Sequence, residues 1–346
     1  MTTRWAILAP GRIAHAFAAD LALVPEAELV AVGSRSLDRA KKFAKQYHVP
    51  SAYGSYQELV ADPDVDVVYI ASPHALHLEH ARMAFEAGKH VLCEKPLALS
   101  VAEAEQMMAL ATTHDRFLME AMWTACHPVV LELQRRLHEG EFGTPRHLHA
   151  ELGSLVDADP ADRLLDPALG ASALLDMGVY PLTLAHLMLG EAESLVATAA
   201  LSSGGIDLDV AIAGRYRGGA LATMTASMTS WSSRRCEIAT DRGRISLDDF
   251  HHPDYATFTP YSGGSGDPDD STDDSGGNGG GPGAEPQRIE GAVPVLGRGF
   301  GHEILEVNQC LAEGRNQSRL VPHSQTLTLM RQMDQIREQL GITFSA

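Results

Sequence analysis

Lys95 is the side chain of this sequence whose setting most favours proton transfer. It lies in Cys93-Glu94-Lys95-Pro96, at the end of an apolar run that predicts a buried strand. Pro96 restricts Lys95 to an extended backbone, so the chain itself fixes the direction of the ammonium group. We expect partial burial and a nearby positive charge to lower the pKa of Lys95 toward neutral pH and make it an acid or base. A surface Lys-Pro pair would look the same, so the motif needs a partner.

Asp176 and Tyr180 are the predicted partners of Lys95. They are four residues apart and would share one face of a helix. Asp176 stands among apolar residues, and a buried carboxyl group needs a polar partner. We therefore expect both side chains to point at one spot. The alternative is that Tyr180 only fills the core of this helix.

A strand-to-helix turn follows the first predicted strand, at Ala9-Pro10-Gly11-Arg12-Ile13. Such turns allow backbone N–H groups to approach a pyrophosphate at a helix N-terminus. The first glycine typical of these turns is Ala9 here. Gly11, Arg12 and Ile13 are candidate nucleotide-binding residues, although a plain tight turn has the same sequence pattern.

The second predicted strand ends in Ser34-Arg35-Ser36, without the Asp or Glu that would bind an adenosine ribose 2′-hydroxyl. A hydroxyl and a guanidinium suit a 2′-phosphate instead, because the guanidinium donates two parallel hydrogen bonds. Arg39 adds charge one turn along the next helix. The pattern predicts NADP(H) rather than NAD(H), and its alternative is a solvated face of arginines.

Ser72, Pro73 and His74 follow the third strand, where ligands bind in a doubly wound sheet. His77 and His80 continue at a three-residue spacing. No Cys or carboxylate stands at a spacing that would complete a zinc site, so we expect no metal. We assign a further set of residues to the cofactor cleft: Ser72, Pro73, His74, His77, Glu94 and Lys95.

The first 120 residues alternate short apolar runs with helical segments, which is typical of a parallel sheet covered by helices. Ser100 and Glu103 have the spacing of a capping box, and Gly88 stands where a helix would end. The predicted strands are Trp5–Ala9, Leu29–Ser34, Val65–Ala71, His90–Cys93 and Phe117–Met119, and the predicted helices are Ile13–Leu23, Leu37–Gln46 and Leu76–Ala87.

The alternation ends near residue 122, and a mostly antiparallel sheet is expected to follow. Its predicted strands are Arg146–Leu152, Leu195–Leu201, Val210–Tyr216, Ala220–Met228 and Arg235–Thr240, with helices at Val129–Glu139, Gly301–Ala312 and Ser324–Leu340. We therefore expect an α/β chain with a doubly wound domain over residues 1–122 and an α+β domain over residues 123–346. Residues 262–287 are rich in Gly, Ser, Asp and Pro and predict a flexible acidic loop.

Composition narrows the classes of partner. The 346 residues carry a formal net charge of −18, which disfavours nucleic acid and anionic lipid surfaces. The four cysteines form no CxxC pair, so we expect no disulfide framework. We expect a cytoplasmic location, because that compartment keeps cysteines reduced. No run approaches the length of a membrane span, and we expect no membrane partner.

In combination, these motifs resemble the glucose–fructose oxidoreductase, inositol dehydrogenase and related (Gfo/Idh/MocA) family, closest to its dimeric dihydrodiol dehydrogenase and NADP-dependent D-xylose dehydrogenase branch. The resemblance covers nearly the whole chain apart from the acidic loop. It rests on Ala31–Arg35, Ala87–Pro96, Met119–Trp123, Arg163–Pro167 and Leu175–Pro181. It implies an N-terminal Rossmann domain and a C-terminal domain whose open sheet makes a homodimer.

The resemblance also implies roles for single residues. Lys95, Asp176 and Tyr180 would be catalytic, Trp123 would line the substrate pocket, and Arg163 would contact cofactor or substrate. The expected activity is hydride transfer between NADP(H) and a hydroxyl or carbonyl of a small sugar, polyol or cyclic trans-diol. The alternatives are a silent NADP(H)-binding sensor on the same fold and an enzyme with a non-carbohydrate substrate. Ala9, and Ala171-Ser172 in place of two glycines, depart from the family pattern.

Overall fold

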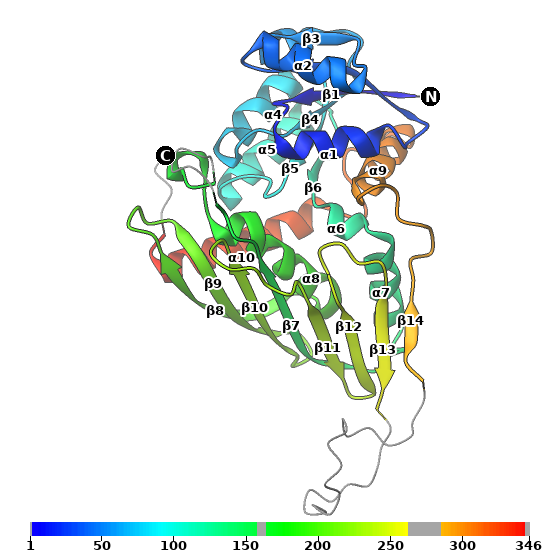
Figure 1. Ribbon diagram of the computed structural model, residues 1–346, viewed down its shortest axis with the longest axis vertical. Helices are drawn as coiled ribbons and strands as arrows, with labels where there is room; N and C mark the ends of the chain where they lie inside the picture. The colour runs from blue at the N-terminus through cyan, green and yellow to red at the C-terminus, as the bar shows by residue number, and fades with distance from the viewer. Residues whose placement is uncertain (1, 158–163, 262–284, 343–346) are drawn as a thin grey trace, which may run out of the picture.

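The computed structural model describes residues 2–157, 164–261 and 285–342 of the chain. Two sheets form its upper and lower parts in Figure 1. The sheet of the first part ends with β6 (Leu118–Ala121), and the sheet of the second part begins with β7 (Pro145–Gly153). The predicted order of a parallel sheet followed by a mostly antiparallel one is confirmed.

The first sheet is parallel and has the strand order β3-β2-β1-β4-β5-β6. Its central strands read as continuous apolar runs because helices cover both faces. The order reverses between β1 and β4, which makes their carboxyl ends a switch point where ligands bind. The other strands are β1 (Thr3–Leu8), β2 (Ala27–Gly33), β3 (Ser51–Tyr53), β4 (Val67–Ile70) and β5 (His90–Glu94), and the helices are α1 (Arg12–Leu21), α2 (Leu37–Tyr47), α3 (Tyr56–Ala61), α4 (His77–Glu86) and α5 (Val101–Thr113).

Local signals set the ends of these helices. The Ser100 hydroxyl accepts the Glu103 N–H at 3.3 Å, so the predicted cap of α5 is confirmed. Gly88 follows α4 with a φ of 74°, a conformation that glycine adopts without steric cost. The sequence patterns did not predict β3 and α3, because both are too short to show periodicity.

The second sheet has eight strands in the order β14-β13-β12-β11-β7-β10-β9-β8. Strands β7 and β10 pair parallel, and the other described neighbours pair antiparallel. The strands are β8 (Ala192–Leu201), β9 (Asp207–Tyr216), β10 (Leu221–Ser227), β11 (Cys236–Thr240), β12 (Gly243–Leu247), β13 (Ala256–Pro260) and β14 (Gln287–Ile289), and the helices of this half are α6 (Trp123–Cys126), α7 (Pro128–His138), α8 (Val179–Leu189), α9 (Phe300–Ala312) and α10 (His323–Leu340).

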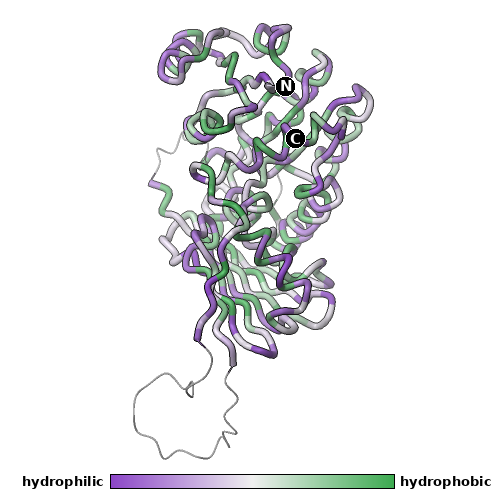
Figure 2. Tube along the Cα trace, turned by 90° about the vertical axis from the view of Figure 1, so that its right-hand side faces the viewer, coloured by the Kyte–Doolittle hydropathy of each residue, from purple (hydrophilic) through white to green (hydrophobic). Residues whose placement is uncertain are grey.

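Helices α8 and α10 pack on one face of this sheet. The opposite face is open, since exposed and buried residues alternate along β10 and β9. Val196, Leu221 and Trp231 are exposed apolar side chains of this half, at 63%, 46% and 83%. In Figure 2 purple, hydrophilic stretches gather at the turns at the foot of the sheet.

The segment Pro167–Leu189, which contains α8, is long and apolar enough to span a membrane by length and composition. Within the structure, 78% of its apolar window is buried against other elements. It is therefore the core helix of the second half.

The last two helices return to the first half of the chain. Helix α9 packs against α1, and α10 contacts α5 as well as β8. The buried Asp20 carboxylate accepts the N–H groups of Arg298 and Phe300 at 2.8 and 3.0 Å, and the Trp5 indole donates to Asn308 at 3.2 Å. The C-terminal helices thus complete the packing of the N-terminal half.

One predicted boundary is wrong. Residues 262–284 of the predicted acidic loop lie outside the described residues, but Gln287 already pairs with Phe258 as the first residue of β14. The sequence around Gln287 has the composition of a loop because β14 is a short edge strand with polar residues.

Candidate active site

A cleft of about 780 Å³ opens at the carboxyl ends of β1, β2, β4 and β5 and is closed on one side by the start of α8. This is the switch point of the parallel sheet. Residues from both halves of the chain therefore line the cleft. Most residues assigned to the site from the sequence line it: Gly11, Arg12, Ile13, Ser34, Arg35, Arg39, Ser72, Pro73, His74, Glu94, Lys95, Asp176 and Tyr180.

The turn after β1 presents the start of α1 to this cleft. Gly11 is the N-cap of α1 and has no side chain that could form a capping hydrogen bond, and the positive end of the helix dipole faces the cleft. Ala9 has a φ of 69°, in the left-handed region, and its carbonyl accepts the Gly11 N–H at 2.7 Å. Ala9 thus adopts a backbone conformation that favours glycine, at a steric cost.

The end of β2 forms the most basic corner of the cleft. Arg35 and Arg39 are exposed, and the hydroxyl of Ser34 accepts the N–H of Ser36 at 3.3 Å. Tyr56 also lines this corner, beside the Arg35 guanidinium, and burial raises the pKa of its hydroxyl. The sequence analysis missed Tyr56, because it begins a helix too short to be predicted.

Lys95 and Asp176 form the central contact of the site. The Lys95 ammonium donates to the main-chain oxygen of Asp176 at 2.7 Å and to its Oδ1 at 3.2 Å. Their side chains are 11% and 18% exposed, so solvent screens this ion pair little. The Lys95 Nζ also lies 4.7 Å from the centre of the Tyr180 ring. The three predicted catalytic residues therefore lie together.

The predicted lowering of the Lys95 pKa is wrong for the protein alone. Burial acts to lower this pKa, but the charges of Asp176, Tyr180 and Glu94 outweigh it and raise the pKa above its usual value. The sequence analysis named Asp176, 81 residues away, as a partner of Lys95, but its pKa prediction considered only burial and a nearby positive charge. Lys95 is a protonated donor at neutral pH.

The helix that carries Asp176 and Tyr180 is not a regular α-helix. Residues Leu174–Gly178 form a π-turn, and α8 begins at Val179. Single π-turns are rare in proteins, and many of those that occur lie at functional sites. The prediction that both side chains point at one spot agrees with the cleft, but the assumed α-helical face between them is wrong.

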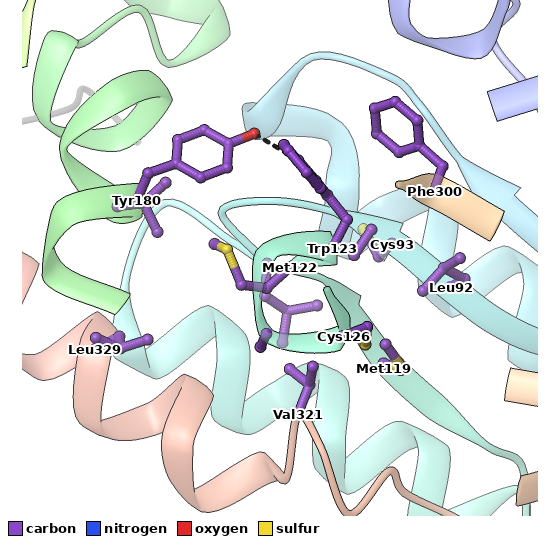
Figure 3. Packing of buried hydrophobic residues seen from close by; sticks show 14 of the residues in the cluster. Leu92, Cys93, Met119, Met122, Trp123, Cys126, Tyr180, Phe300, Val321 and Leu329 are labelled. Carbon is purple, nitrogen blue, oxygen red and sulfur yellow. Dashed lines mark hydrogen bonds between the residues drawn. The ribbon is translucent and has the colours of Figure 1, made fainter. Parts of the chain in front are cut away.

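Tyr180 is held by a tryptophan from α6. The Trp123 Nε1 donates to the Tyr180 hydroxyl at 3.2 Å, as the dashed line in Figure 3 marks. Both side chains are buried, and Phe300 packs against the Trp123 ring with ring centres 5.4 Å apart. Because its oxygen accepts this bond, the O–H of Tyr180 is left to donate elsewhere. Burial raises the pKa of Tyr180 to about 12, against the opposing effect of Lys95.

The histidines after β4 have different surroundings. His74 Nδ1 lies 3.2 Å from the Gly170 carbonyl, so this nitrogen carries the proton, and Nε2 lies 3.8 Å from Asp176 Oδ1. His77 is fully buried and contacts the carbonyls of Ser72 and Pro96 at 2.9 and 3.1 Å. His77 joins two loops beneath the cleft and is not among the residues that line it, unlike its predicted role.

Other predicted features have simpler outcomes. Arg163 lies outside the described residues. Among the residues that the structure describes, no group of three or more His, Cys, Asp or Glu side chains could hold a metal ion. Glu94 accepts a hydrogen bond from the buried Tyr69 hydroxyl, which fixes the carboxylate at the base of the cleft.

The sequence analysis also missed two histidines beside the reactive groups. His251 lies edge to face with Tyr180, with ring centres 4.4 Å apart, and His252 stacks on Trp123 at 4.7 Å. Both belong to the connection between β12 and β13, which carries no recognisable motif. Only the long-range pairing of the second sheet brings them to the site.

Two family models and several curated relatives match this chain. The oxidoreductase family NAD-binding Rossmann-fold model matches residues 3–122, and the GFO/IDH/MocA C-terminal domain model matches residues 130–246. The trans-1,2-dihydrobenzene-1,2-diol dehydrogenases of Xenopus laevis and Bos taurus are 30% and 32% identical to this chain. Each alignment covers 99% of this chain, with 100% of the first relative and 98% of the second.

The chain belongs to the Gfo/Idh/MocA family of oxidoreductases. It is a dehydrogenase or reductase with an NAD(P)-binding N-terminal half.

Solved structures agree with this fold. Aldose-aldose oxidoreductase from Caulobacter crescentus, complexed with glycerol, superposes with a TM-score of 0.84 at 23% identity, covering 98% of this chain and 97% of that one. KijD10, a 3-ketoreductase from Actinomadura kijaniata in complex with NADP and TDP-benzene, gives 0.82 at 25% identity, covering 98% of both chains.

Proposed function

We propose that this protein is an NADP(H)-dependent oxidoreductase that transfers hydride between the nicotinamide and a hydroxyl or carbonyl carbon of a sugar, polyol or cyclic trans-diol. Lys95 and Tyr180 act as its acid and base groups. The observation that carries the proposal is a single cleft lined by the N-terminus of α1, a basic corner and the Lys95–Asp176–Tyr180 group. The diol dehydrogenase relatives support the substrate class.

The lining of the cleft fits a phosphorylated dinucleotide. The N-terminus of α1 favours negative charge through the helix dipole, as the pyrophosphate requires. Ser34 and Arg35 follow β2 and Arg39 lies in the first turn of α2, at the corner where a 2′-phosphate would lie, and no described carboxylate lines that corner. Ser72, Pro73, His74 and Glu94 would line the path toward the nicotinamide.

The catalytic residues manage the proton of the substrate oxygen. In reduction, Lys95 has three N–H donors and uses two on Asp176, which leaves one for a carbonyl oxygen. The Tyr180 O–H, oriented by Trp123, is the second donor to that oxygen. In oxidation one of these two groups, in its deprotonated form, accepts the hydroxyl proton, with Asp176 holding Lys95 in place. Positioning and proton transfer together lower the barrier.

The open face of the second sheet is the proposed homodimer surface. Val196, Leu221 and Trp231 expose apolar area on this half, which a second copy would cover. A homodimer through this sheet is what the resemblance to the family implies. We also propose a cytoplasmic location, and the four cysteines, all buried and unpaired, agree with a reducing compartment.

The first experiment is a substrate panel. Purified protein is given NADP⁺ and then NAD⁺ with aldoses, inositols and trans-diols, and absorbance of the reduced nicotinamide is followed. Growth of absorbance with NADP⁺ is expected. Tight NADPH binding with no absorbance change across the panel would reject the proposed substrate class.

A further inference from the structure

The connection between β12 and β13 places an imidazole against the proposed catalytic pair. The His251 ring meets the Tyr180 ring at 88° with centres 4.4 Å apart, and it meets the Trp123 ring at 78° and 5.0 Å. Trp123 is in turn hydrogen-bonded to Tyr180. His251 therefore contacts both side chains that set the position of the Tyr180 hydroxyl.

The backbone of this connection is held firmly. One oxygen of Asp249 accepts the N–H groups of His251 and His252, at 2.9 and 3.1 Å. The other oxygen of Asp249 lies 3.6 Å from Arg234, whose carbonyl accepts the Phe250 N–H at 2.9 Å. The histidine pair is thus tied to the chain before β11.

His251 is a neutral hydrogen-bonding group in this setting. Burial lowers its pKa to about 2, and the nearby His252, Lys95 and Arg234 act in the same direction against Asp176. A neutral imidazole has one donor and one acceptor nitrogen. Its Nδ1 is enclosed and has no hydrogen-bond partner among the described residues, so Nε2 is the nitrogen left for a ligand. A neutral ring is suited to hydrogen-bonding a neutral polar group and not to donating a proton.

Resting on the proposed function, we propose that His251 is a substrate-positioning residue that hydrogen-bonds a second hydroxyl, on the carbon next to the reacting one. The reacting oxygen lies within reach of Lys95 and Tyr180, and His251 borders the same tyrosine. A substrate without the second hydroxyl would leave the partly buried imidazole of His251 without that partner, which a polar site penalises. His251 thereby selects vicinal diols and sugars over simple alcohols.

The test compares paired substrates that differ by this one hydroxyl. The probes are D-glucose with 2-deoxy-D-glucose, and trans-cyclohexane-1,2-diol with cyclohexanol, each with NADP⁺. In His251→Phe the edge contacts remain but both nitrogens are lost. We expect the preference for the hydroxylated member, measured as a ratio of kcat/KM values, to fall about tenfold, mostly through KM. The Kd for NADPH should not change.

Two further variants separate positioning from packing. His251→Gln keeps a donor and an acceptor and should retain most of the preference, and His138→Phe, on the exposed end of α7, should behave as wild type. If a melting experiment shows that His251→Phe does not fold, His251→Leu takes its place in the test, because leucine lacks the same two nitrogens.

The two hypotheses fail in different ways. A wild type that oxidises none of the four probes counts against the proposed function itself. A wild type that is active, with an unchanged preference in the folded variant that lacks the nitrogens, overturns the role of His251 alone.

Discussion

The Lys95 ammonium donates to both the main-chain and the side-chain oxygen of Asp176, at 2.7 and 3.2 Å. One residue therefore fixes the direction of the lysine side chain and also sets its charge. Because Asp176 stands on the π-turn before α8, the position of Lys95 depends on the second half of the chain. The first half can bind a nucleotide, but it does not contain a complete acid-base site.

Lys95→Met should remove the main proton donor while it leaves the phosphate end of the cleft intact. We expect turnover to fall about a hundred- to ten-thousand-fold, the usual contribution of general acid-base catalysis. The Kd for NADPH, measured by fluorescence, should change little. Lys45→Met, on the exposed end of α2, is the matched control. Normal turnover in Lys95→Met would show that another group transfers the proton.

The pH dependence should differ between the two directions of reaction. The pKa of Lys95 is raised by Asp176, Tyr180 and Glu94 over the opposing effect of burial, and burial raises that of Tyr180 to about 12. Both groups stay protonated as pH rises through neutrality, so reduction, which needs the acid form, should be flat between pH 6 and 9, about the range that an assay covers. Oxidation needs the base form and should rise with pH. A bell-shaped profile for reduction centred near neutrality would contradict these pKa directions.

Arg35 and Arg39 should decide which dinucleotide binds. A guanidinium on a phosphate contributes more than a neutral hydrogen bond, so Arg35→Ala is expected to weaken NADPH binding about ten- to a hundredfold. NADH binding should stay the same, because that dinucleotide lacks the 2′-phosphate. The change in the ratio of the two Kd values is the measurement, with Arg331→Ala on the exposed side of α10 as control. Equal losses for both dinucleotides would mean that Arg35 acts elsewhere.

Ala9→Gly should stabilise the protein. The left-handed φ of 69° destabilises the folded state by about 1 to 2 kcal/mol when the residue is alanine. Glycine removes this strain, but it also stabilises the unfolded chain by roughly 0.4 to 1 kcal/mol, because its backbone has more conformational freedom there. We expect a net gain of about 0.5 to 1 kcal/mol in the free energy of unfolding. Ala200→Gly, in the exposed strand β8, should instead destabilise. Chemical denaturation measures both, and the same sign for the two variants would contradict the strain at Ala9.

Trp231→Ser should weaken self-association if the open sheet is the homodimer surface. Trp231 is 83% exposed, and covering such a side chain stabilises an interface through its apolar area. Sedimentation across a range of concentrations should show a dimer that dissociates more readily in the variant. A wild type that sediments as a monomer at all concentrations would remove the proposal.

The motifs at the strand ends could be predicted because each functional residue directly follows the apolar run that predicts its strand. Gly11, Ser34 and Lys95 each follow an apolar run that marks a buried strand, and parallel strands bring such ends together. His251 and Tyr56 could not be found this way. His251 follows a short strand that only the register of the second sheet places, and Tyr56 starts a helix of six residues.

Signals within one segment also failed where distant charges decide the outcome. The burial of Lys95 was predicted and Asp176 was named as its partner, but the pKa prediction left out the carboxylate charge, which raises the pKa. His77 looked like a cleft residue from its spacing, but its ring contacts the carbonyls of Ser72, Pro96 and Leu97. In both cases the outcome depends on how closely the fold brings a polar partner.

The contacts of Asp20 and Trp5 with α9 and the segment before it also bear on how the chain can be made. These pairs are separated by 278 to 303 residues, so the contacts can form only after α9 has been translated. Until then Trp5 lacks its hydrogen bond to Asn308, and α1 lacks its packing against α9. The nucleotide-binding half is therefore translated first but completes its packing only when α9 is present.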